Sequence, residues 1–279
     1  MIEVVAPGPL ATIQDLGRVG YAALGVPRSG AFDRAALRLA NRLVGNPPGA
    51  AAIEVMFGGL QLHLLRPATV ALTGAVCPGA PDRAAAVTLP AGARIRLGAP
   101  AHGLRSYLAV RGGFAVPAVL GSRSTDTLSG IGPSPLRPGD LLPIGETADP
   151  VPGVSAAEAT PSQVLRVRYG PRDDWFTAQA RRLLIETAWE VRPESDRVGL
   201  RLTGPPLARV RDGELPSEPT LPGAVQVPPD GRPIVFGPDA PVTGGYPVIA
   251  VVTDLDPAAQ LRPGDAVRFS AARFSSAGG

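Results

Sequence analysis

The sequence predicts a mainly β protein built from two similar halves, each with one short helix. Gly (34) and Pro (33) are abundant while aromatic residues make up 5%, which favours many short strands joined by turns over a helical bundle. Short strand-like segments recur at a spacing typical of barrels and sandwiches. The segment Leu-Arg-Pro-Gly-Asp occurs near the end of each half, at 136–140 and 261–265, and indicates an internal duplication.

The first half, residues 1–150, contains one predicted helix, over 34–43. Asp33 stands where an N-cap is expected, Leu39 and Leu43 lie on one helical face, and Gly45 follows the end. The other elements of this half are strands, predicted at 2–6, 60–65, 69–73, 93–97 and 104–110, with a last one after the turn at 136–141.

The second half, residues 151–279, begins within a predicted linker at 146–163, which is rich in Ala, Pro, Ser and Thr and lacks periodicity. The turn at 170–174 is expected to cap a helix from Trp175 to about Glu186. Strands are predicted at 164–169, 189–191, 224–227, 233–236 and 248–252, and after 261–265. Two such units in tandem would leave a cleft between them, and clefts of this kind often bind ligands.

Composition excludes several kinds of chemistry. All 27 basic residues are arginine, so Schiff-base, P-loop and kinase-type lysine chemistry is absent. The single cysteine, Cys77, excludes an internal disulfide and a multi-cysteine metal site. His63 and His102 form no two-histidine metal motif. His63 lies in an apolar run and Cys77 has no histidine or basic cluster nearby, so both are interpreted as structural residues.

Charge and hydropathy bear on location and partners. The net charge of +3 comes from scattered arginines, which disfavours nucleic-acid binding. No window reaches the roughly 18 apolar residues of a membrane span. Residues 1–5 show neither the basic nor the apolar region of a signal peptide, and we expect a cytoplasmic protein.

Polar, glycine-rich loops flank the first predicted helix, at 13–18 and 25–33. They are either ordinary tight turns or recognition loops, for which glycine provides positive φ and close backbone approach. Several loop arginines adjoin Gly, Ser or Asp: Arg18, Arg28, Arg111, Arg123 and Arg197. Each forms either a surface ion pair or, if several converge, part of a site for a carboxylate or phosphate. Nearby carboxylates could orient the arginines or hold Mg²⁺.

These loops resemble the carboxyltransferase-subunit family, which includes the C subunit of 5-oxoprolinase, allophanate hydrolase subunit 2 and the carboxyltransferase domain of urea amidolyase. The resemblance extends over nearly the whole chain, in order. The residues that carry it lie at 14–18, 25–33, 40–46, 73–75, 106–113, 121–125, 195–202, 226–228 and 243–247.

The resemblance implies two tandem cyclophilin-like β-barrels, each with a short helix. It also implies an enzymatic activity and partner proteins. The expected activity is ATP-dependent opening of 5-oxoproline to glutamate, with ATP and Mg²⁺. The expected partners are the B subunit of 5-oxoprolinase, which is cyclophilin-like and resembles a kinase inhibitor, and the lactam-hydrolysing A subunit. One alternative is carboxyl transfer in urea carboxylation, with biotin supplied by a partner. Another is a non-enzymatic antagonist of a kinase-inhibitor-like protein.

Candidate site residues follow from the matching motifs. Catalytic roles are predicted for Asp15, Arg18, Asp33, Arg123 and Asp196, where arginine would stabilise developing negative charge and aspartate would orient Mg²⁺ or accept a proton. Metal ligands are not assigned. Substrate or nucleotide binding is predicted for Gln14, Ser29, Gly30, Arg111, Gly112, Gly113, Ser124, Thr125, Arg197, Gln226, Thr243, Gly244, Gly245 and Tyr246.

Two departures from the family pattern fall in the second half. Pro241-Val242 precede Thr243 where the family commonly has Gln-Thr, and Val248 replaces a usual lysine. Either change removes a polar contact, so the first-half loops are the stronger candidate site.

Overall fold

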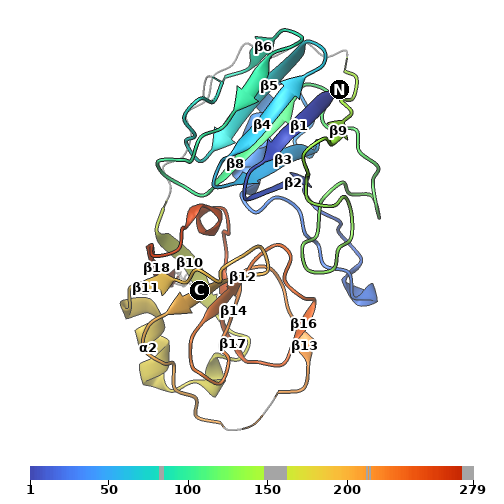
Figure 1. The fold of residues 1–279 in the computed structure, drawn as a ribbon. Helices are drawn as coiled ribbons and strands as arrows, with labels where there is room; N and C mark the ends of the chain where they lie inside the picture. Colours follow the sequence, from blue (N-terminus) through green and yellow to red (C-terminus); the bar gives the residue numbers. More distant parts are fainter. Residues whose placement is uncertain (82–84, 148–161, 212, 214, 272–279) are drawn as a thin grey trace, which may run out of the picture. The chain divides into compact units, whose positions relative to one another are not determined.

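The computed structural model describes residues 1–81, 85–147, 162–211, 213 and 215–271 (Figure 1). The chain divides into two compact units, Met1–Pro161 and Ser162–Gly279. The predicted boundary after residue 150 lies in 148–161, outside the described residues. Among the residues described, no helix has the length and apolar character needed to cross a membrane.

Two antiparallel sheets form the first unit. One has the order β7-β4-β1-β9 and the other β2-β3-β8-β5-β6. Apolar side chains from both sheets, such as Val4, Ile13, Leu62 and Leu108, pack into one core, which explains why β4 alternates buried and partly exposed residues. The bounds are β1 Ile2–Pro7, β2 Leu10–Gln14, β3 Ala52–Met56, β4 Leu60–Leu64, β5 Ala68–Gly74, β6 Val87–Leu89, β7 Arg94–Arg96, β8 Arg105–Val110 and β9 Leu141–Leu142.

Helix α1, Arg34–Leu43, covers the outer face of the second sheet. Its buried residues, including Leu37 and Leu43, pack against Tyr107 and Ala109 of β8. Since the opposite face of β8 contributes Leu108 to the core, all six residues of this strand are buried. The helix therefore fixes the position of the loop that leads into it.

A closed barrel forms the second unit, in the order β10-β17-β14-β15-β12-β11-β18, and β18 pairs in parallel with β10. Helix α2, Ala178–Glu186, is tied to the barrel by Trp189, whose indole N–H donates to the Leu184 carbonyl over 3.0 Å. The strands are β10 Val164–Tyr169, β11 Trp189–Val191, β12 Gly199–Thr203, β13 Glu218–Pro219, β14 Ala224–Gln226, β15 Ile234–Phe236, β16 Thr243–Gly244, β17 Val248–Val252 and β18 Ala266–Ala271; the 3-10 turns are η1 Ala22–Leu24, η2 Asp173–Trp175 and η3 Pro257–Gln260.

The repeated Leu-Arg-Pro-Gly-Asp segment forms the same turn in each unit. The Asp140 carboxylate accepts from the Arg137 N–H over 2.7 Å, and the Asp265 carboxylate accepts from the Arg262 N–H over 2.8 Å. A strand follows each turn, β9 in the first unit and β18 in the second. The shared geometry supports the predicted duplication.

The predicted fold class is confirmed: the protein is mainly β, and the described residues contain two α-helices, one in each unit. The predicted helix in the second half starts too early, because Asp173–Trp175 forms a 3-10 turn and Thr177 caps α2 by accepting from the Ala180 N–H. Six strands were not predicted: β2, β3, β6, β12, β13 and β16.

Candidate functional site

Two loops of the first unit meet beside the end of β2: the loop between β2 and α1, and the loop that contains residues 121–126. The Ala31 N–H donates to the Asp15 carbonyl over 2.9 Å, and the Thr125 N–H donates to the Ile13 carbonyl over 2.9 Å. Gly30 permits this approach, because its φ is +93° and a Cβ there would lie 2.7 Å from the Gly17 nitrogen. The structure therefore brings together six predicted site residues, which we call the Arg18 cluster: Gln14, Asp15, Arg18, Ser29, Ser124 and Thr125.

Asp15 holds the two loops together. Its Oδ1 accepts from the Gly17 N–H at 2.7 Å and from the hydroxyls of Ser122 and Ser124 at 2.7 and 2.5 Å. Its Oδ2 accepts from the Arg123 N–H at 2.6 Å. A buried carboxylate with this many donors serves as an acceptor that orders the loops. Ser122 was not among the predicted site residues, although it lies in the same polar loop.

Arg18 is the least satisfied charged group of the cluster. Its side chain is buried, and Nη2 donates to the Ser124 carbonyl. Nε and Nη1 have no hydrogen-bond partner, and no carboxylate of the described residues forms an ion pair with it. Buried donors of this kind are rare and costly unless water, an ion or a ligand satisfies them. The unpaired side of this guanidinium is suited to bind an oxyanion.

Other unpaired polar atoms lie on residues of the same loops. Among the described residues, Gln14 Oε1, Thr125 Oγ1 and Asp126 Oδ2 lack partners although all three residues are buried. The opposite end of the Gln14 amide is fixed, since Nε2 donates to the Thr125 carbonyl over 2.9 Å. Ser29 donates to the same carbonyl over 3.0 Å. The cluster thus contains a cation, an amide oxygen and a hydroxyl whose hydrogen-bonding capacity is not used by the described residues.

A buried network supports the loop that contains Ser29. The Tyr107 hydroxyl donates to Glu54 over 2.7 Å and accepts from the Asp33 N–H over 2.7 Å. Glu54 also accepts from the Phe32 N–H at 3.0 Å and forms an ion pair with Arg105 at 3.6 Å. Burial above all, then the charges of Glu54 and Asp33, raises the pKa of Tyr107 well above its usual value, so it stays protonated. Glu54, Arg105 and Tyr107 were not among the predicted site residues; the signal available for Glu54 was an acid within the apolar run 53–55.

Two residues predicted to be catalytic have structural contacts. Asp33 Oδ1 accepts from the Ala36 N–H over 2.8 Å, which confirms the predicted N-cap of α1. Arg123 is exposed, and its Nε donates to the Val116 carbonyl over 2.7 Å. Their catalytic roles stay predictions.

Arg111, Gly112 and Gly113 lie elsewhere in the first unit, after β8. Arg111 Nη1 is 3.4 Å from the Val44 carbonyl at the end of α1. A Cβ on Gly112 would lie 2.2 Å from the Gly145 carbonyl oxygen, so glycine is needed for backbone packing there. Arg111 lines a separate cavity that includes none of the Arg18 cluster.

In the second unit, Asp196 and Arg197 have different environments. Asp196 is exposed, and its Oδ1 accepts from the N–H groups of Val198 and Gly199, which closes a turn. Arg197 is buried and donates from Nε and Nη2 to the carboxylate of Asp239, at 2.8 and 2.9 Å. Asp239 is fully buried and was not predicted. This bidentate pair joins two loops of the barrel.

The remaining predicted residues form a smaller group. Gln226 is buried, and its Nε2 donates to the Tyr246 carbonyl over 3.1 Å. A Cβ on Gly244 would lie 2.6 Å from that nitrogen, so a side chain there would displace the Gln226 amide. Thr243 and Tyr246 are exposed, and Gly245 lies between Gly244 and Tyr246 in the sequence. The structure therefore gathers Gln226 with Gly244 and Tyr246.

The described residues contain no group of three His, Cys, Asp or Glu side chains placed to hold a metal ion. His63 Nδ1 lies 3.1 Å from the Glu3 carboxylate. Cys77 is buried in the core of the first unit, with its sulfur 3.3 Å from the Ser106 hydroxyl. Both contacts agree with structural roles.

The fold and these loops define a class of protein. Residues 24–271 match the family model described as carboxyltransferase domain, subdomain A and B. The chain belongs to this family.

Three individual proteins are similar to this chain over nearly its whole length. The chain is 40% identical over 280 residues to the C subunit of 5-oxoprolinase from Escherichia coli (strain K12), covering 96% of this chain and 90% of the relative. It is 33% identical to the C subunit of 5-oxoprolinase from Haemophilus influenzae, covering 99% of this chain and 93% of the relative. It is 32% identical to urea amidolyase of Saccharomyces cerevisiae, covering 99% of this chain but 17% of that protein.

Solved structures share the fold. The crystal structure of TTHA0988 superposes with a TM-score of 0.87 at 37% identity, over 96% of this chain and 55% of that one. The chain thus spans about half the length of that protein. Urea amidolyase of K. lactis gives a TM-score of 0.86 at 29% identity, over 96% of this chain and 18% of that one.

Proposed function

We propose that this chain is the C subunit of an ATP-dependent 5-oxoprolinase, which opens 5-oxo-L-proline to L-glutamate together with partner subunits. Near full-length similarity to two proteins that are named as this 5-oxoprolinase component supports the proposal. The structural observation that carries it is the buried Arg18 guanidinium with two nitrogens unpaired.

The Arg18 cluster matches the chemistry of the substrate. 5-Oxoproline carries a carboxylate and a lactam carbonyl, and both present oxygens to N–H donors. Arg18 would bind one of these oxygens, and Gln14 Oε1, which is unpaired, would accept from the lactam N–H. Because the guanidinium is already buried and oriented by Ser124, it would stabilise developing negative charge without reorganising.

A lactam is a poor electrophile, so activation by ATP is required. Transfer of the γ-phosphoryl group to the lactam oxygen releases ADP. Water then adds to the carbonyl carbon, the C–N bond breaks, and a second water releases phosphate, leaving glutamate. Mg²⁺ would enter with the nucleotide phosphates, as in other phosphoryl transfers. A cytoplasmic location, where ATP is available, belongs to this proposal.

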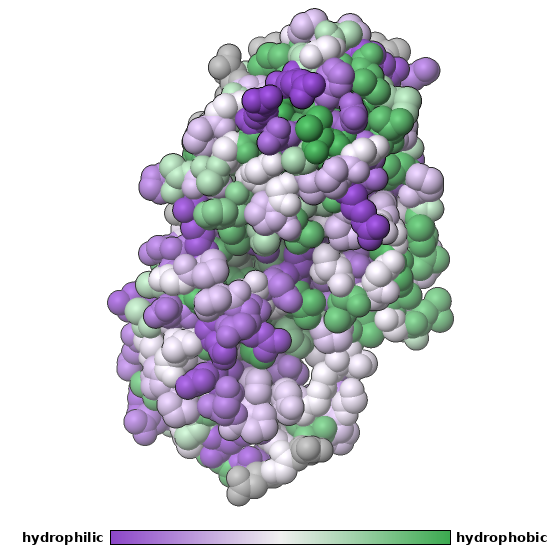
Figure 2. Space-filling view, viewed as in Figure 1, coloured by the Kyte–Doolittle hydropathy of each residue, from purple (hydrophilic) through white to green (hydrophobic). Residues whose placement is uncertain are grey.

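Partner proteins are part of the proposal, because the relatives are named as subunits. The kinase-inhibitor-like B subunit and the lactam-hydrolysing A subunit are the expected partners. Large aliphatic side chains are exposed on the two loops that carry the Arg18 cluster: Val19, Leu24, Val119, Leu120 and Leu128. Figure 2 shows apolar surface at this end of the first unit, beside the blue loop of Figure 1. Exposed apolar surface of this kind is typical of a protein interface.

Similarity to urea amidolyase favours one alternative, the carboxyltransferase part of a biotin-dependent urea carboxylase. In that reaction a carboxyl group moves from biotin to an amide nitrogen, and an arginine would bind the carboxylate in transit. The biotin would be carried by a partner, since the chain has no lysine to hold it.

ATP hydrolysis by the complex of this chain with its two partner proteins separates these functions. The proposal predicts hydrolysis stimulated by 5-oxoproline, with glutamate formed in equal amount. Turnover with urea and a biotinylated carrier, but none with 5-oxoproline, would move the assignment to carboxyl transfer. A stable complex without either turnover would indicate a non-enzymatic antagonist.

A further inference from the structure

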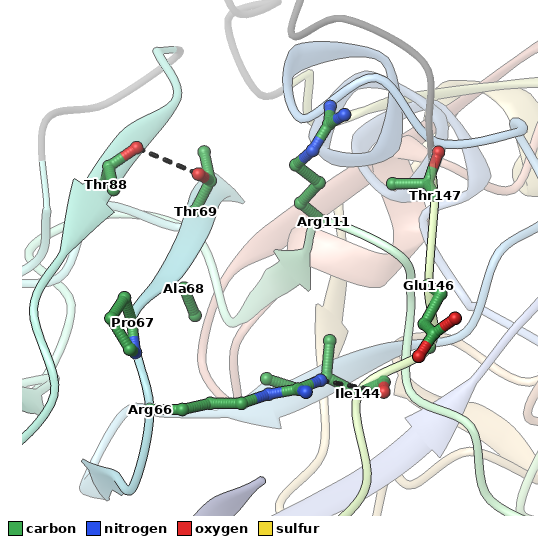
Figure 3. A pocket seen from close by; sticks show the side chains of 10 residues that line it. Arg66, Pro67, Ala68, Thr69, Thr88, Arg111, Ile144, Glu146 and Thr147 are labelled. Carbon is green, nitrogen blue, oxygen red and sulfur yellow. Dashed lines mark hydrogen bonds between the residues drawn. The ribbon is translucent and has the colours of Figure 1, made fainter.

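A cavity in the first unit is lined by none of the residues of the Arg18 cluster. Its volume is about 540 Å³, within the range of small-molecule sites. The start of β5, Thr88 of β6, Arg111 after β8 and residues 144–147 after β9 form its walls. Figure 3 shows Thr69 and Thr88 on one side, Glu146 and Thr147 on the other, and the side chains of Arg66 and Arg111 between them.

Contacts among the lining residues hold these groups in place. The Thr69 and Thr88 hydroxyls are 2.8 Å apart, so one of them donates to the other. Arg66 Nη2 donates to the Ile144 carbonyl over 3.0 Å, which lays the side chain across the cavity (Figure 3). The Arg111 N–H donates to the Thr69 carbonyl over 2.8 Å. These contacts orient the side chains of Arg66, Thr69 and Thr88 in the lining.

Glycine packing fixes the wall that carries Glu146. The Gly145 N–H donates to the Gly113 carbonyl over 3.0 Å, and a Cβ on Gly145 would lie 2.3 Å from the Gly112 carbonyl oxygen. Side chains are excluded at this contact, so the segment after Gly145 is held against the end of β8. Gly112 and Gly113 thus shape the cavity without lining it.

The charges of the cavity select an anion. Arg66 and Arg111 supply two positive charges and Glu146 one negative charge, so the lining is net positive. Arginine binds carboxylate and phosphate through its planar fork, and the threonine hydroxyls add neutral polar groups to the lining.

We propose that this cavity binds a small anion through a carboxylate or phosphoryl group, with Arg66 and the Thr69–Thr88 hydroxyl pair as its principal ligands. Glu146 opposes the ligand's charge and limits its affinity. The site is separate from the Arg18 cluster and does not depend on the oxoprolinase assignment.

Isothermal titration calorimetry on the full chain tests the proposal, with inorganic phosphate and L-glutamate as probes. At least one probe is expected to bind saturably, with Kd on the order of 1 mM or lower. Arg66→Gln should weaken binding about tenfold through loss of a charge-assisted hydrogen bond, and Thr88→Val should weaken it a few-fold. Glu146→Gln should strengthen it a few-fold, because a repulsive charge is removed.

Controls separate this cavity from the Arg18 cluster and from general charge effects. Binding should persist in Arg18→Gln, which removes the other anion-binding guanidinium. Arg94→Gln, which removes an exposed arginine on β7 outside the cavity, should leave it unchanged. Binding of phosphate alone would identify a phosphoryl ligand, and binding of glutamate alone would identify a carboxylate ligand. Either result supports the proposal.

Absence of saturable binding for both probes would overturn the proposal. Equal binding by Arg66→Gln and the unaltered chain would also overturn it, because the anion would then lie elsewhere. Since Arg66 is exposed, its substitution leaves the core intact, and circular dichroism verifies the fold of each variant. ATP turnover does not enter the measurement, so failure of the oxoprolinase assignment is distinguishable from failure here.

Discussion

At the scale of single residues, hydrogen-bond partners separate structural groups from those available to a ligand. Asp15 has its carboxylate oxygens occupied by the loops it joins, and Arg197 is paired with Asp239. Arg18 has a buried, unpaired face. Of the arginines in the predicted site, Arg18 therefore has the clearest structural basis for binding substrate.

Tyr107 gives a pH-dependent prediction at this scale. Its pKa in the folded protein is raised, so the folded state keeps the phenol proton after the unfolded chain has lost it. Stability from this group is complete below the unfolded pKa of about 10 and is lost as the pH rises from there towards the folded pKa. Urea unfolding at increasing alkaline pH should show a smaller loss of stability in Tyr107→Phe than in the unaltered protein.

The same substitution has an effect at neutral pH. Tyr107→Phe removes a donor to Glu54 and an acceptor for the Asp33 N–H, so it should cost about 1–3 kcal/mol of unfolding free energy. In the alkaline measurement, the same loss of stability with pH in Tyr107→Phe and in the unaltered protein would contradict a raised pKa for Tyr107.

The family motifs, together with the glycine-rich polar loops that contain them, predicted Asp15, Arg18 and Ser124 as site residues. Their partners in other segments could not be predicted in the same way. Glu54 meets Tyr107 across two strands, and Asp239 meets Arg197 across 42 positions. Such contacts depend on strand register and loop closure, which local pattern does not specify.

At the scale of elements, Asp33 tests the difference between capping and catalysis. Asp33→Ala should lower unfolding free energy by about 1 kcal/mol, since the Ala36 N–H loses its acceptor. Asp33→Asn keeps an acceptor oxygen and should retain both stability and 5-oxoproline-dependent ATP hydrolysis. Loss of turnover in a stable Asp33→Asn protein would instead support the catalytic role predicted from the sequence.

The Arg197–Asp239 pair gives a second prediction at this scale. Arg197→Met leaves the Asp239 carboxylate buried without its arginine and should cost about 3–5 kcal/mol. The double variant Arg197→Met, Asp239→Leu should recover much of that loss in urea unfolding. A stable Arg197→Met protein that loses turnover would show that Arg197 acts on substrate.

Elements with strong local signals were predicted well. Helix α1 has a capping Asp33 and regular apolar spacing, and the β-branched run of β17 reads as a buried strand. β2 and β3 were missed because each adjoins a glycine-rich loop, and the loop composition dominated the local pattern.

At the scale of the whole molecule, the repeated turn supports a duplication of one unit, although the sheets of the two units differ. The strands of the first unit form two sheets, whereas those of the second form a closed barrel and a two-stranded sheet of β13 and β16. Composition and repeats predicted the class and the two halves. The pairing order within each unit required the structure, because it is set by contacts distant in sequence.

Leu24 tests the proposed assembly. Its side chain is 76% exposed, so Leu24→Asp should leave the fold unchanged while weakening binding to a partner protein by about tenfold or more. Leu65→Asp, at an exposed leucine after β4, is the matched control and should bind normally. Copurification and analytical ultracentrifugation measure both. Equal binding by the two variants would exclude the Leu24 loop from the interface.

The most direct test of the account measures 5-oxoproline-stimulated ATP hydrolysis by the assembled complex with Arg18→Gln. The unpaired Arg18 guanidinium is expected to bind substrate oxygen, so stimulation should fall about 100-fold or more while the complex stays assembled. Arg94→Gln should retain full stimulation. Undiminished stimulation in an assembled Arg18→Gln complex would contradict the assignment of the Arg18 cluster as the substrate site.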